Sequence, residues 1–204
     1  MAEFWEEAFK DKQEMWGTEP AYAALVTKDF FVEKGVKKVL IPGIGYGRNA
    51  QVFSQAGMEI TGIEISETAI NLIRKYYLQQ WVVHQGSVAD MPFDDFKYDG
   101  IFCYALIHLL DKDERVKFIA DCYGQLEENG YMVFTTITRQ SQTYGQGTRI
   151  GKHRFEMFGG VKMFFYDLET VQAEFGNYGL IEVIEVQENY PFYLIKCQKP
   201  KQED

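Results

Sequence analysis

Cysteine, proline and positive charge are scarce in this sequence, and each shortage excludes a class of protein. The three cysteines among 204 residues contain no C-x-x-C pair, so neither a disulfide framework nor a cysteine metal site is expected. Five prolines exclude a collagen-like chain. The 21 basic residues are outnumbered by 30 acidic ones, giving a net charge of −9, whereas proteins that bind nucleic-acid backbones usually have the opposite balance. We therefore expect reduced thiols, a cytoplasmic location and no nucleic-acid partner.

Long apolar runs are also missing. The longest, residues 101–110, covers ten positions and contains His108, whereas a membrane-spanning helix needs about 20 apolar residues. The first ten residues, MAEFWEEAFK, are acidic and have neither the basic nor the apolar region of a signal peptide. Hydrophobic residues make up 46% of the chain, which is ample for a core. The sequence predicts a soluble protein of one domain, residues 1–204, with no membrane partner.

Strand and helix patterns alternate along the chain. Apolar and β-branched runs predict strands at 36–41, 59–65, 81–84, 98–104, 131–137, 180–186 and 192–197. Apolar residues at helical spacing predict helices at 48–55, 67–79, 112–126 and 168–178, after one or two helices before residue 36. Alternating strands and helices form a parallel sheet covered on both faces, but the last two strands have no helix between them and must pair antiparallel. The predicted fold class is α/β: a doubly wound, mostly parallel seven-stranded sheet with an antiparallel edge strand.

The most informative segment is a glycine-rich turn between the first strand and the next helix, where Gly43, Gly45 and Gly47 alternate with other residues. Glycine lets the backbone adopt positive φ and approach a ligand closely, and free N–H groups at a helix start attract negative charge. Glu64 ends the second strand, 21 residues after Gly43, where a carboxylate can accept hydrogen bonds from ribose hydroxyls. Together these features favour a site for a nucleoside-type ligand. The alternative is that the glycines form only a structural turn and that Glu64 is only a surface residue.

The spacing of the glycines discriminates between nucleoside ligands. A dinucleotide site has the pattern G-x-G-x-x-G, and counted from Gly43 its third glycine falls on Arg48. The pattern G-x-G-x-G followed by Arg-Asn-Ala instead resembles motif I of the class I S-adenosylmethionine-dependent methyltransferases. Further segments resemble that family's motifs in the same order: 62–66, the adenine-binding loop at 85–93, 98–108 and 126–132. Residues 16–20 are similar to the lead-in of small methyltransferases of the tellurite-resistance and thiopurine type.

The resemblance, which covers about residues 36–137, implies a cofactor and its contacts. The cofactor is S-adenosyl-L-methionine, and the product formed from it is S-adenosyl-L-homocysteine. The implied cofactor contacts are Gly43, Ile44, Gly45, Gly47, Arg48, Asn49, Glu64, Ile65, Ser87, Val88, Cys103 and Tyr104. Two positions depart from the family's pattern: Pro42 replaces an acidic residue before the glycines, and Ser87 replaces the acid of the adenine loop, a role that Asp90 could take instead.

The resemblance also divides the domain into four parts. Residues 1–35 are a helical lead-in, 36–137 the cofactor-binding core, 138–166 a substrate-side insertion and 167–204 a C-terminal helix and strand pair. The methyl acceptor is expected at the carboxyl ends of the fourth and fifth strands, where Tyr104 and His108 are the candidate catalytic residues. The alternative for His108 is a packed core histidine. Trp16 is a candidate for closing over the substrate, although a lone tryptophan is more often part of a core.

The segment after the fifth strand reverses the charge of the chain. It is long, polar and glycine-rich, and Glu156 is its one acid from residue 139 to 165. Its basic residues are Arg139, Arg149, Lys152, Arg154 and Lys162. Two interpretations are open: an electropositive wall for an anionic acceptor, with Arg149 and Arg154 as the preferred contacts, or a solvated loop paired with acidic neighbours.

These observations predict an S-adenosylmethionine-dependent methyltransferase with a small-molecule acceptor, which is anionic if the basic segment lines its site. One alternative is a nicotinamide-dependent oxidoreductase, which Arg48 disfavours. Another is a non-catalytic S-adenosylmethionine-binding module, which a closed site without an acceptor pocket would favour. No metal is expected, because His84, His108 and His153 lack the spacing of metal ligands. The attacking atom of the acceptor and the oligomeric state are left open by the sequence.

Overall fold

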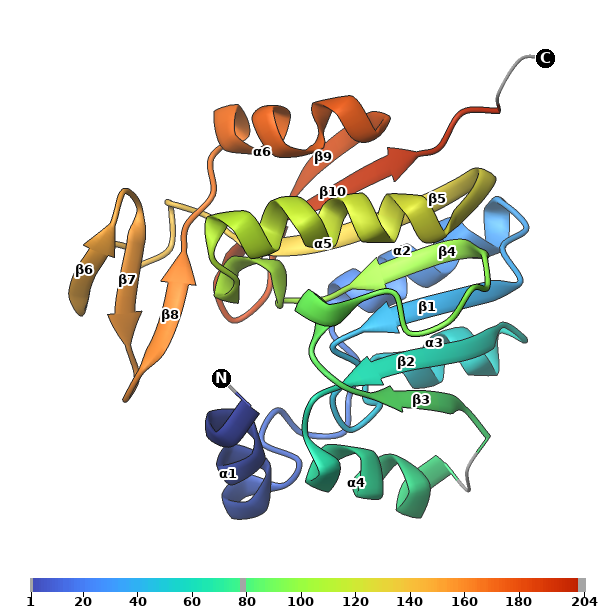
Figure 1. Cartoon of the computed structure of the whole chain (residues 1–204), viewed down its shortest axis with the longest axis horizontal. Helices are drawn as coiled ribbons and strands as arrows, with labels where there is room; N and C mark the ends of the chain where they lie inside the picture. Colours follow the sequence, from blue (N-terminus) through green and yellow to red (C-terminus); the bar gives the residue numbers. More distant parts are fainter. Residues whose placement is uncertain (1, 78–79, 202–204) are drawn as a thin grey trace.

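The computed structural model describes residues 2–77 and 80–201, and the chain has the predicted α/β architecture (Figure 1). Seven strands form one sheet in the order β3-β2-β1-β4-β5-β10-β9, which confirms the predicted doubly wound sheet. The strands are β1 (Lys38–Pro42), β2 (Glu59–Glu64), β3 (Val82–Gln85), β4 (Tyr98–Cys103), β5 (Leu126–Ile137), β9 (Leu180–Gln187) and β10 (Pro191–Gln198).

Strands β1 to β5 run parallel, and the sheet reverses direction at β10. Phe192 of β10 pairs with Ile137 of β5 in antiparallel register, and β9 pairs antiparallel with β10. The link between β9 and β10 is residues 188–190, too short for the crossover helix that a parallel connection needs. The carboxyl ends of β1, β2, β4 and β5 therefore lie at the same edge of the sheet as the β9–β10 turn.

Helices cover both faces of the sheet, because successive residues of a buried strand point to opposite sides. Val39 and Ile41 of β1 belong to the same core cluster as Phe31 of α2. Leu40, between them, packs in the cluster of Phe118 of α5. The helices are α1 (Ala2–Lys12), α2 (Tyr22–Glu33), α3 (Ala50–Gln55), α4 (Glu67–Tyr77), α5 (Lys112–Gln125) and α6 (Leu168–Phe175). Within residues 2–77 and 80–201, no helix is long and apolar enough to cross a bilayer.

Side-chain caps fix where two of these helices begin. At α5, the Asp111 carboxylate accepts the Glu114 N–H at 3.0 Å while the Glu114 carboxylate accepts the Asp111 N–H at 2.7 Å. At α4, Ser66 Oγ accepts the Ala69 N–H at 3.1 Å, as its position before the helix predicts.

Some predicted boundaries shift for structural reasons. The helix predicted at 48–55 begins at Ala50, because the glycine turn continues up to it. The helix predicted at 67–79 is described up to Tyr77, and positions 78 and 79 lie outside the described residues. Strand β5 begins at Leu126, earlier than predicted, because Leu126 already pairs with Tyr98 of β4.

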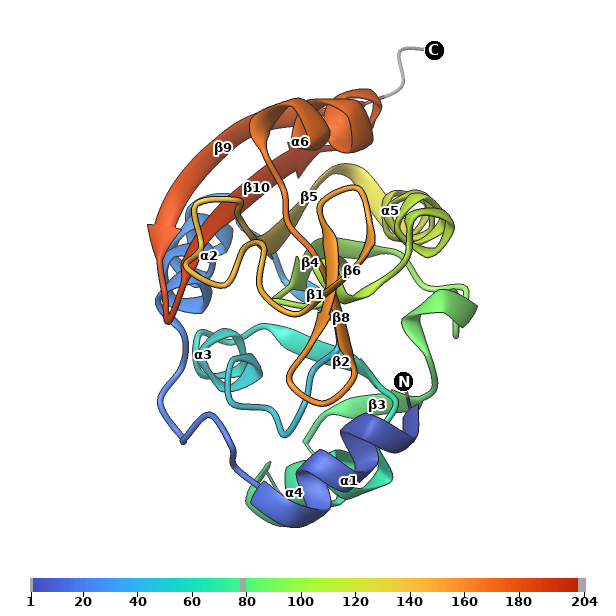
Figure 2. The ribbon, with the colours of Figure 1, turned by 90° about the vertical axis from the view of Figure 1, so that its left-hand side faces the viewer.

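The insertion after β5, expected as a long polar loop, folds into a second sheet. Its antiparallel strands are β6 (Thr148–Gly151), β7 (Arg154–Met157) and β8 (Val161–Phe164). Figure 2 looks onto the edge where the parallel strands end, and this small sheet crosses in front of it. The ends of the insertion are joined, because Arg139 N donates to Tyr166 O and Tyr166 N to Ile137 O, at 2.9 and 3.1 Å. The insertion is thus a folded cap on the sheet edge.

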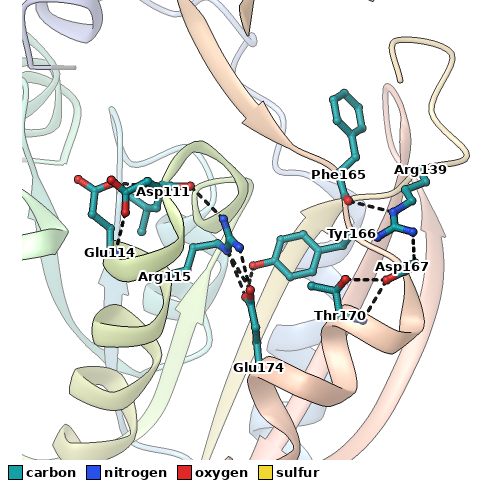
Figure 3. Close-up of polar contacts among 10 residues, drawn as sticks. Asp111, Glu114, Arg115, Arg139, Phe165, Tyr166, Asp167, Thr170 and Glu174 are labelled. Carbon is teal, nitrogen blue, oxygen red and sulfur yellow. Dashed lines mark hydrogen bonds and ion pairs between the residues drawn. The ribbon is translucent and has the colours of Figure 1, made fainter. Parts of the chain in front are cut away.

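A polar network fixes the base of this cap (Figure 3). Arg115 of α5 donates to the Glu174 carboxylate of α6 at 2.8 Å, and Tyr166 Oη donates to the same carboxylate at 2.7 Å. Arg139, at the start of the insertion, forms an ion pair with Asp167, the N-cap residue of α6. The chain that leaves the cap is thereby joined to both helices of one face.

Candidate active site

A cavity of about 550 Å³ lies at the edge where β1, β2, β4 and β5 end. The ends of these strands and the turns that follow them form its floor, while α1, β8 and the β9–β10 turn contribute its walls. The carboxyl edge of a doubly wound sheet is where such folds bind their ligands. The cavity is therefore the candidate active site.

The glycine turn forms the floor next to β1. Gly43 and Gly45 have φ angles of +70° and +60°, a region that residues with a side chain adopt only at a cost. A Cβ atom at Gly43 would lie 2.3 Å from Leu106 Cδ1, whereas one at Gly45 would meet only Phe9 Cζ, at 4.0 Å. The turn is closed by packing at Gly43 and has room at Gly45 for a ligand to approach the backbone.

Glu64, at the end of β2, holds this turn in place. Its carboxylate accepts the N–H groups of Gly45, Ile65 and Ser66, each at 2.9 Å. The side chain is buried, and burial raises the pKa of the carboxyl against the opposing effect of the three donors. An ionised carboxylate has about four acceptor positions, so Glu64 retains capacity for one more hydrogen bond. A contact with both hydroxyls of a ribose would displace one of the backbone donors.

The structure brings most of the predicted cofactor contacts together. Those that line the cavity are Gly43, Ile44, Gly45, Arg48, Asn49, Glu64, Ile65, Ser87, Val88 and Tyr104. Of the two candidates in the adenine loop, Ser87 lines the cavity, whereas Asp90 is exposed and lies outside the lining. An open turn, a buried carboxylate with spare acceptor capacity and a lining serine fit a nucleoside-bearing cofactor.

Two predicted contacts lie away from the cavity. A Cβ atom at Gly47 would lie 2.6 Å from the Trp81 ring. Glycine is therefore needed here so that the Trp81 ring can pack against the backbone. Cys103 is completely buried in the cluster on the α5 face of the sheet, while its neighbour Phe102 lines the cavity. The alternation of side chains along β4 turns the Cys103 thiol away from the site.

Tyr104 and His108 line the cavity beside Phe192 of β10. The Tyr104 and Phe192 rings are parallel with centroids 6.2 Å apart, and the His108 ring meets Phe192 edge-on at 5.8 Å. Burial lowers the pKa of His108 to about 3, and its Nδ1 accepts the Ile137 N–H at 3.5 Å. Burial likewise raises the pKa of Tyr104 to about 12. At neutral pH His108 is uncharged and a weak base, and Tyr104 keeps its proton.

Trp16 also lines the cavity, within an aromatic cluster that holds the N-terminal segment on the glycine turn. Its ring stacks on Tyr46 with centroids 6.2 Å apart, and Phe9 of α1 packs edge-on against Tyr46 at 6.1 Å. Tyr46 Oη donates to Gly17 O at 2.7 Å, and Arg48 Nη1 donates to Trp16 O at 3.1 Å. Residues of the glycine turn thus bind the segment that covers them.

Helix α1 is held beside α4 by apolar packing of Phe9 against Ala69 and Leu72 and by the carboxylate of Glu6. Glu6 accepts hydrogen bonds from Ser66 Oγ and Thr68 Oγ1, both at 2.7 Å, and from the Thr68 N–H at 3.2 Å. These bonds, with that from Ser66 as the largest cause, lower the pKa of Glu6 to about 2. A negative charge is also favoured at this place, because it lies at the N-terminus of α4.

The basic residues of the insertion do not line the cavity. Arg149 is exposed, and its Nε donates to Gly151 O at 3.2 Å. Arg154 is partly buried within the small sheet but outside the cavity lining. Alternate residues of a strand point to opposite faces, and the insertion turns apolar side chains inward instead. Those that reach the cavity are Phe158, Val161 and Met163. The two arginines predicted to contact the acceptor are therefore not brought to the site.

Two groups of lining residues were not predicted from the sequence. The first is the apolar face of α1: Phe4, Trp5, Ala8 and Phe9. Their spacing of three and four residues is the signal that could have identified them. The second is Glu188, Asn189 and Tyr190, in the β9–β10 turn. The observed antiparallel pairing of β10 with β5 places this turn at the edge where β5 ends, and the sequence of the turn carries no motif.

Comparisons with known proteins agree with the site. Residues 40–134 match the family described as a methyltransferase domain. A ubiquinone biosynthesis O-methyltransferase from Alkalilimnicola ehrlichii is 26% identical over 113 residues, which are 53% of this chain and 44% of that protein. A probable S-adenosylmethionine-dependent methyltransferase from Mycobacterium tuberculosis is 26% identical over 115 residues, 56% of this chain and 40% of its own length. The chain thus spans less than half the length of these curated relatives.

Solved structures share the fold. An S-adenosylmethionine-dependent methyltransferase from Clostridium acetobutylicum superimposes with a TM-score of 0.75 at 11% identity, covering 95% of this chain and 98% of the other. The 1,6-didemethyltoxoflavin N1-methyltransferase of Burkholderia thailandensis has a TM-score of 0.76 at 13% identity, covering 98% and 87%. Residues 40–134 of this chain match a methyltransferase domain, and the glycine turn, Glu64 and the sheet order agree with the class I S-adenosylmethionine-dependent methyltransferase fold.

Proposed function

We propose that this chain transfers a methyl group from S-adenosylmethionine to a small molecule bound in the cavity. The supporting observation is that one cavity runs from Glu64 and the glycine turn past Tyr104 to Tyr190 and Phe192, beyond the cofactor contacts. Its volume of about 550 Å³ falls among small-molecule sites, which measure about 300–1,000 Å³. The toxoflavin-precursor methyltransferase of the same fold holds 1,6-didemethyltoxoflavin together with S-adenosylhomocysteine. A cavity that extends beyond the cofactor contacts favours an enzyme over a non-catalytic binding module.

The chain's contribution to the reaction is position and exclusion of water. When bound, S-adenosylmethionine supplies an electrophilic methyl group on a positively charged sulfur. The Gly45 N–H and the Glu64 carboxylate, 2.9 Å apart, hold the turn on which the nucleoside rests. The rings of Tyr104 and Phe192 form a flat wall that orients the acceptor, and the apolar residues of α1 and β8 keep water out.

Neither candidate catalytic residue is suited to remove a proton at neutral pH. The pKa of His108, lowered by burial to about 3, makes it a poor base. The pKa of Tyr104, raised to about 12, leaves it a hydrogen-bond donor. We therefore assign His108 a packing role against Ile137 and Phe192, and Tyr104 a role in orienting the acceptor.

The proposal is tested by turnover with a small-molecule library. The wild-type protein is incubated with S-adenosylmethionine and pools of amines, phenols, thiols and carboxylates, and S-adenosylhomocysteine release is measured. Pools that respond are deconvoluted, and the product is identified by the mass gain of one methyl group in place of hydrogen. Release that requires a small molecule and is lost in Glu64→Ala supports the proposal. Release only with protein or nucleic-acid acceptors, or with none, contradicts it.

A further inference from the structure

The acceptor end of the cavity combines aromatic surface with one carboxylate. Tyr104, Tyr190 and Phe192 line it, and the rings of Tyr104 and Phe192 are parallel, with centroids 6.2 Å apart. Glu188 lies among them in the β9–β10 turn. Aromatic faces attract cations through the negative charge of their π system, and a carboxylate attracts them directly.

Glu188 is held in a fixed position by another element. Its Oε1 accepts the Ala23 N–H at 2.8 Å, at the start of α2, whose N-cap residue Ala21 provides no side-chain cap. Glu188 therefore caps α2 from a distant turn, and one reading of the residue is structural. That cap uses one oxygen. Within residues 2–77 and 80–201, no donor is bonded to Oε2, and Glu188 remains in the cavity lining.

The other charged residues of the lining are Glu64, Arg48 and Lys12. Glu64 accepts three backbone N–H groups at the cofactor end. Arg48 donates through Nη1 to the carbonyls of Trp16 and Glu19, both at 3.1 Å, and its guanidinium carbon lies 5.9 Å from the centroid of the Tyr104 ring. Lys12 belongs to α1, at the wall that covers the cofactor end. Burial is the largest cause of the raised Tyr104 pKa; the charge of Glu188 raises it further, and Arg48 opposes both through its charge and a hydrogen bond.

We infer that Glu188 is a specificity-determining residue that selects acceptors bearing a protonated nitrogen attached to an aromatic or apolar body. The inference rests on the proposed small-molecule function and names its substrate class. Glu188 Oε2 binds the cationic group, and Tyr104 and Phe192 pack against the body of the molecule. This preference for a cation is the reverse of the preference for an anion that the basic insertion suggested. Arg149 and Arg154, on which that expectation rested, lie outside the cavity.

The test uses three indoles that differ in charge: tryptamine (cation), tryptophol (neutral) and indole-3-acetate (anion). Their affinities for the protein saturated with S-adenosylhomocysteine are measured by calorimetry at neutral pH. In the wild type, tryptamine should bind roughly tenfold or more tightly than indole-3-acetate, as expected for one partly desolvated charge pair. In Glu188→Gln, whose amide oxygen can keep the Ala23 bond, this ratio should fall close to one. The control Glu185→Gln removes the same charge from an exposed residue of β9 outside the cavity and should keep the wild-type ratio.

If Glu188 only capped α2, Glu188→Gln would lower the free energy of unfolding without changing the ranking of the indoles. Urea unfolding of each variant therefore accompanies the titrations. Equal or tighter binding of indole-3-acetate, an unchanged ratio in Glu188→Gln, or no binding of any indole overturns the inference. These outcomes are independent of the library experiment. Turnover with another class of small molecule would sustain the proposed function even then, and indole selectivity without any turnover would sustain the inference alone.

Discussion

The two ends of the cavity are built in different ways. At the cofactor end, the Gly45 N–H and the Glu64 carboxylate belong to one strand–turn–helix–strand unit and meet at 2.9 Å. At the acceptor end, Tyr104, Glu188 and Phe192 come from the end of β4, the β9–β10 turn and β10. The first end depends on backbone conformation, and the second on side chains brought together by the whole fold.

This difference predicts how the protein responds to substitution. A change at the cofactor end disturbs a backbone that the ligand must approach, so its effect on affinity should be large. A change at the acceptor end replaces one side chain among several, so it should alter selection of the acceptor while cofactor binding persists. The four predictions below probe this contrast in order of expected effect.

The largest effect is expected for Gly45→Val. The branched side chain would project into the space where a ligand approaches the turn, and affinity for S-adenosylhomocysteine should fall by about 100-fold or more. Positive φ should also cost about 1–2 kcal/mol of stability. Gly57→Val is the matched control, because Gly57 has a φ of +84°, open space around it and no part in the cavity. Calorimetry and urea unfolding should show similar destabilisation of both variants but weakened binding only for Gly45→Val; equal binding by both would contradict the account.

Glu64→Ala should weaken S-adenosylhomocysteine binding less than Gly45→Val does. The variant leaves the N–H groups of Gly45, Ile65 and Ser66 without their acceptor, and it leaves a ribose hydroxyl unpaired. The cost in binding free energy should be about 1–3 kcal/mol. Glu59→Ala, at the exposed start of the same strand, serves as control and should bind like the wild type. Wild-type affinity in Glu64→Ala would mean that the carboxylate serves the turn and not the ligand.

Glu6→Gln tests how α1 is attached. The folded-state pKa of Glu6 is about 2, below its ordinary value of 4.5, so its contribution to stability is present above pH 4.5 and is lost as the pH falls toward 2. The wild type should therefore unfold at higher urea than Glu6→Gln at neutral pH, and the gap should close through that window. Glu7→Gln, at the exposed next position, should show no such gap. A difference in urea stability that is absent at neutral pH, or that grows on acidification, would contradict the attachment of α1 through Glu6.

The smallest effect is expected for Arg149→Ala. The side chain is exposed and outside the cavity lining, so affinities for S-adenosylhomocysteine and for the indoles should equal those of the wild type. A loss of acceptor affinity would show that the small sheet turns its basic face inward when ligand binds, and the assignment of specificity to Glu188 would then have to be shared.

The contrast also explains what the sequence could predict. Alternating strand and helix patterns predicted the mostly parallel sheet with its antiparallel edge, and short motifs predicted that the glycine turn and Glu64 lie at its carboxyl edge. The polar composition of the insertion predicts a basic loop, because its strands are short. Composition does not reveal which face of a small sheet turns inward. Cys103 was expected to contact the cofactor, but the alternation of side chains along β4 places it on the α5 face of the sheet, while its neighbour Phe102 lines the cavity. Glu188 became visible only once the antiparallel pairing of β10 with β5 was known.

The central claim is that the glycine turn and Glu64 form a site for S-adenosylmethionine and not for a dinucleotide. Its most direct test is calorimetric titration of the wild-type protein with S-adenosylhomocysteine and, separately, with oxidised nicotinamide adenine dinucleotide. We expect saturable binding of S-adenosylhomocysteine, lost in Gly45→Val, and no binding of the dinucleotide. Binding of the dinucleotide, or failure of S-adenosylhomocysteine to bind the folded wild-type protein, would contradict it.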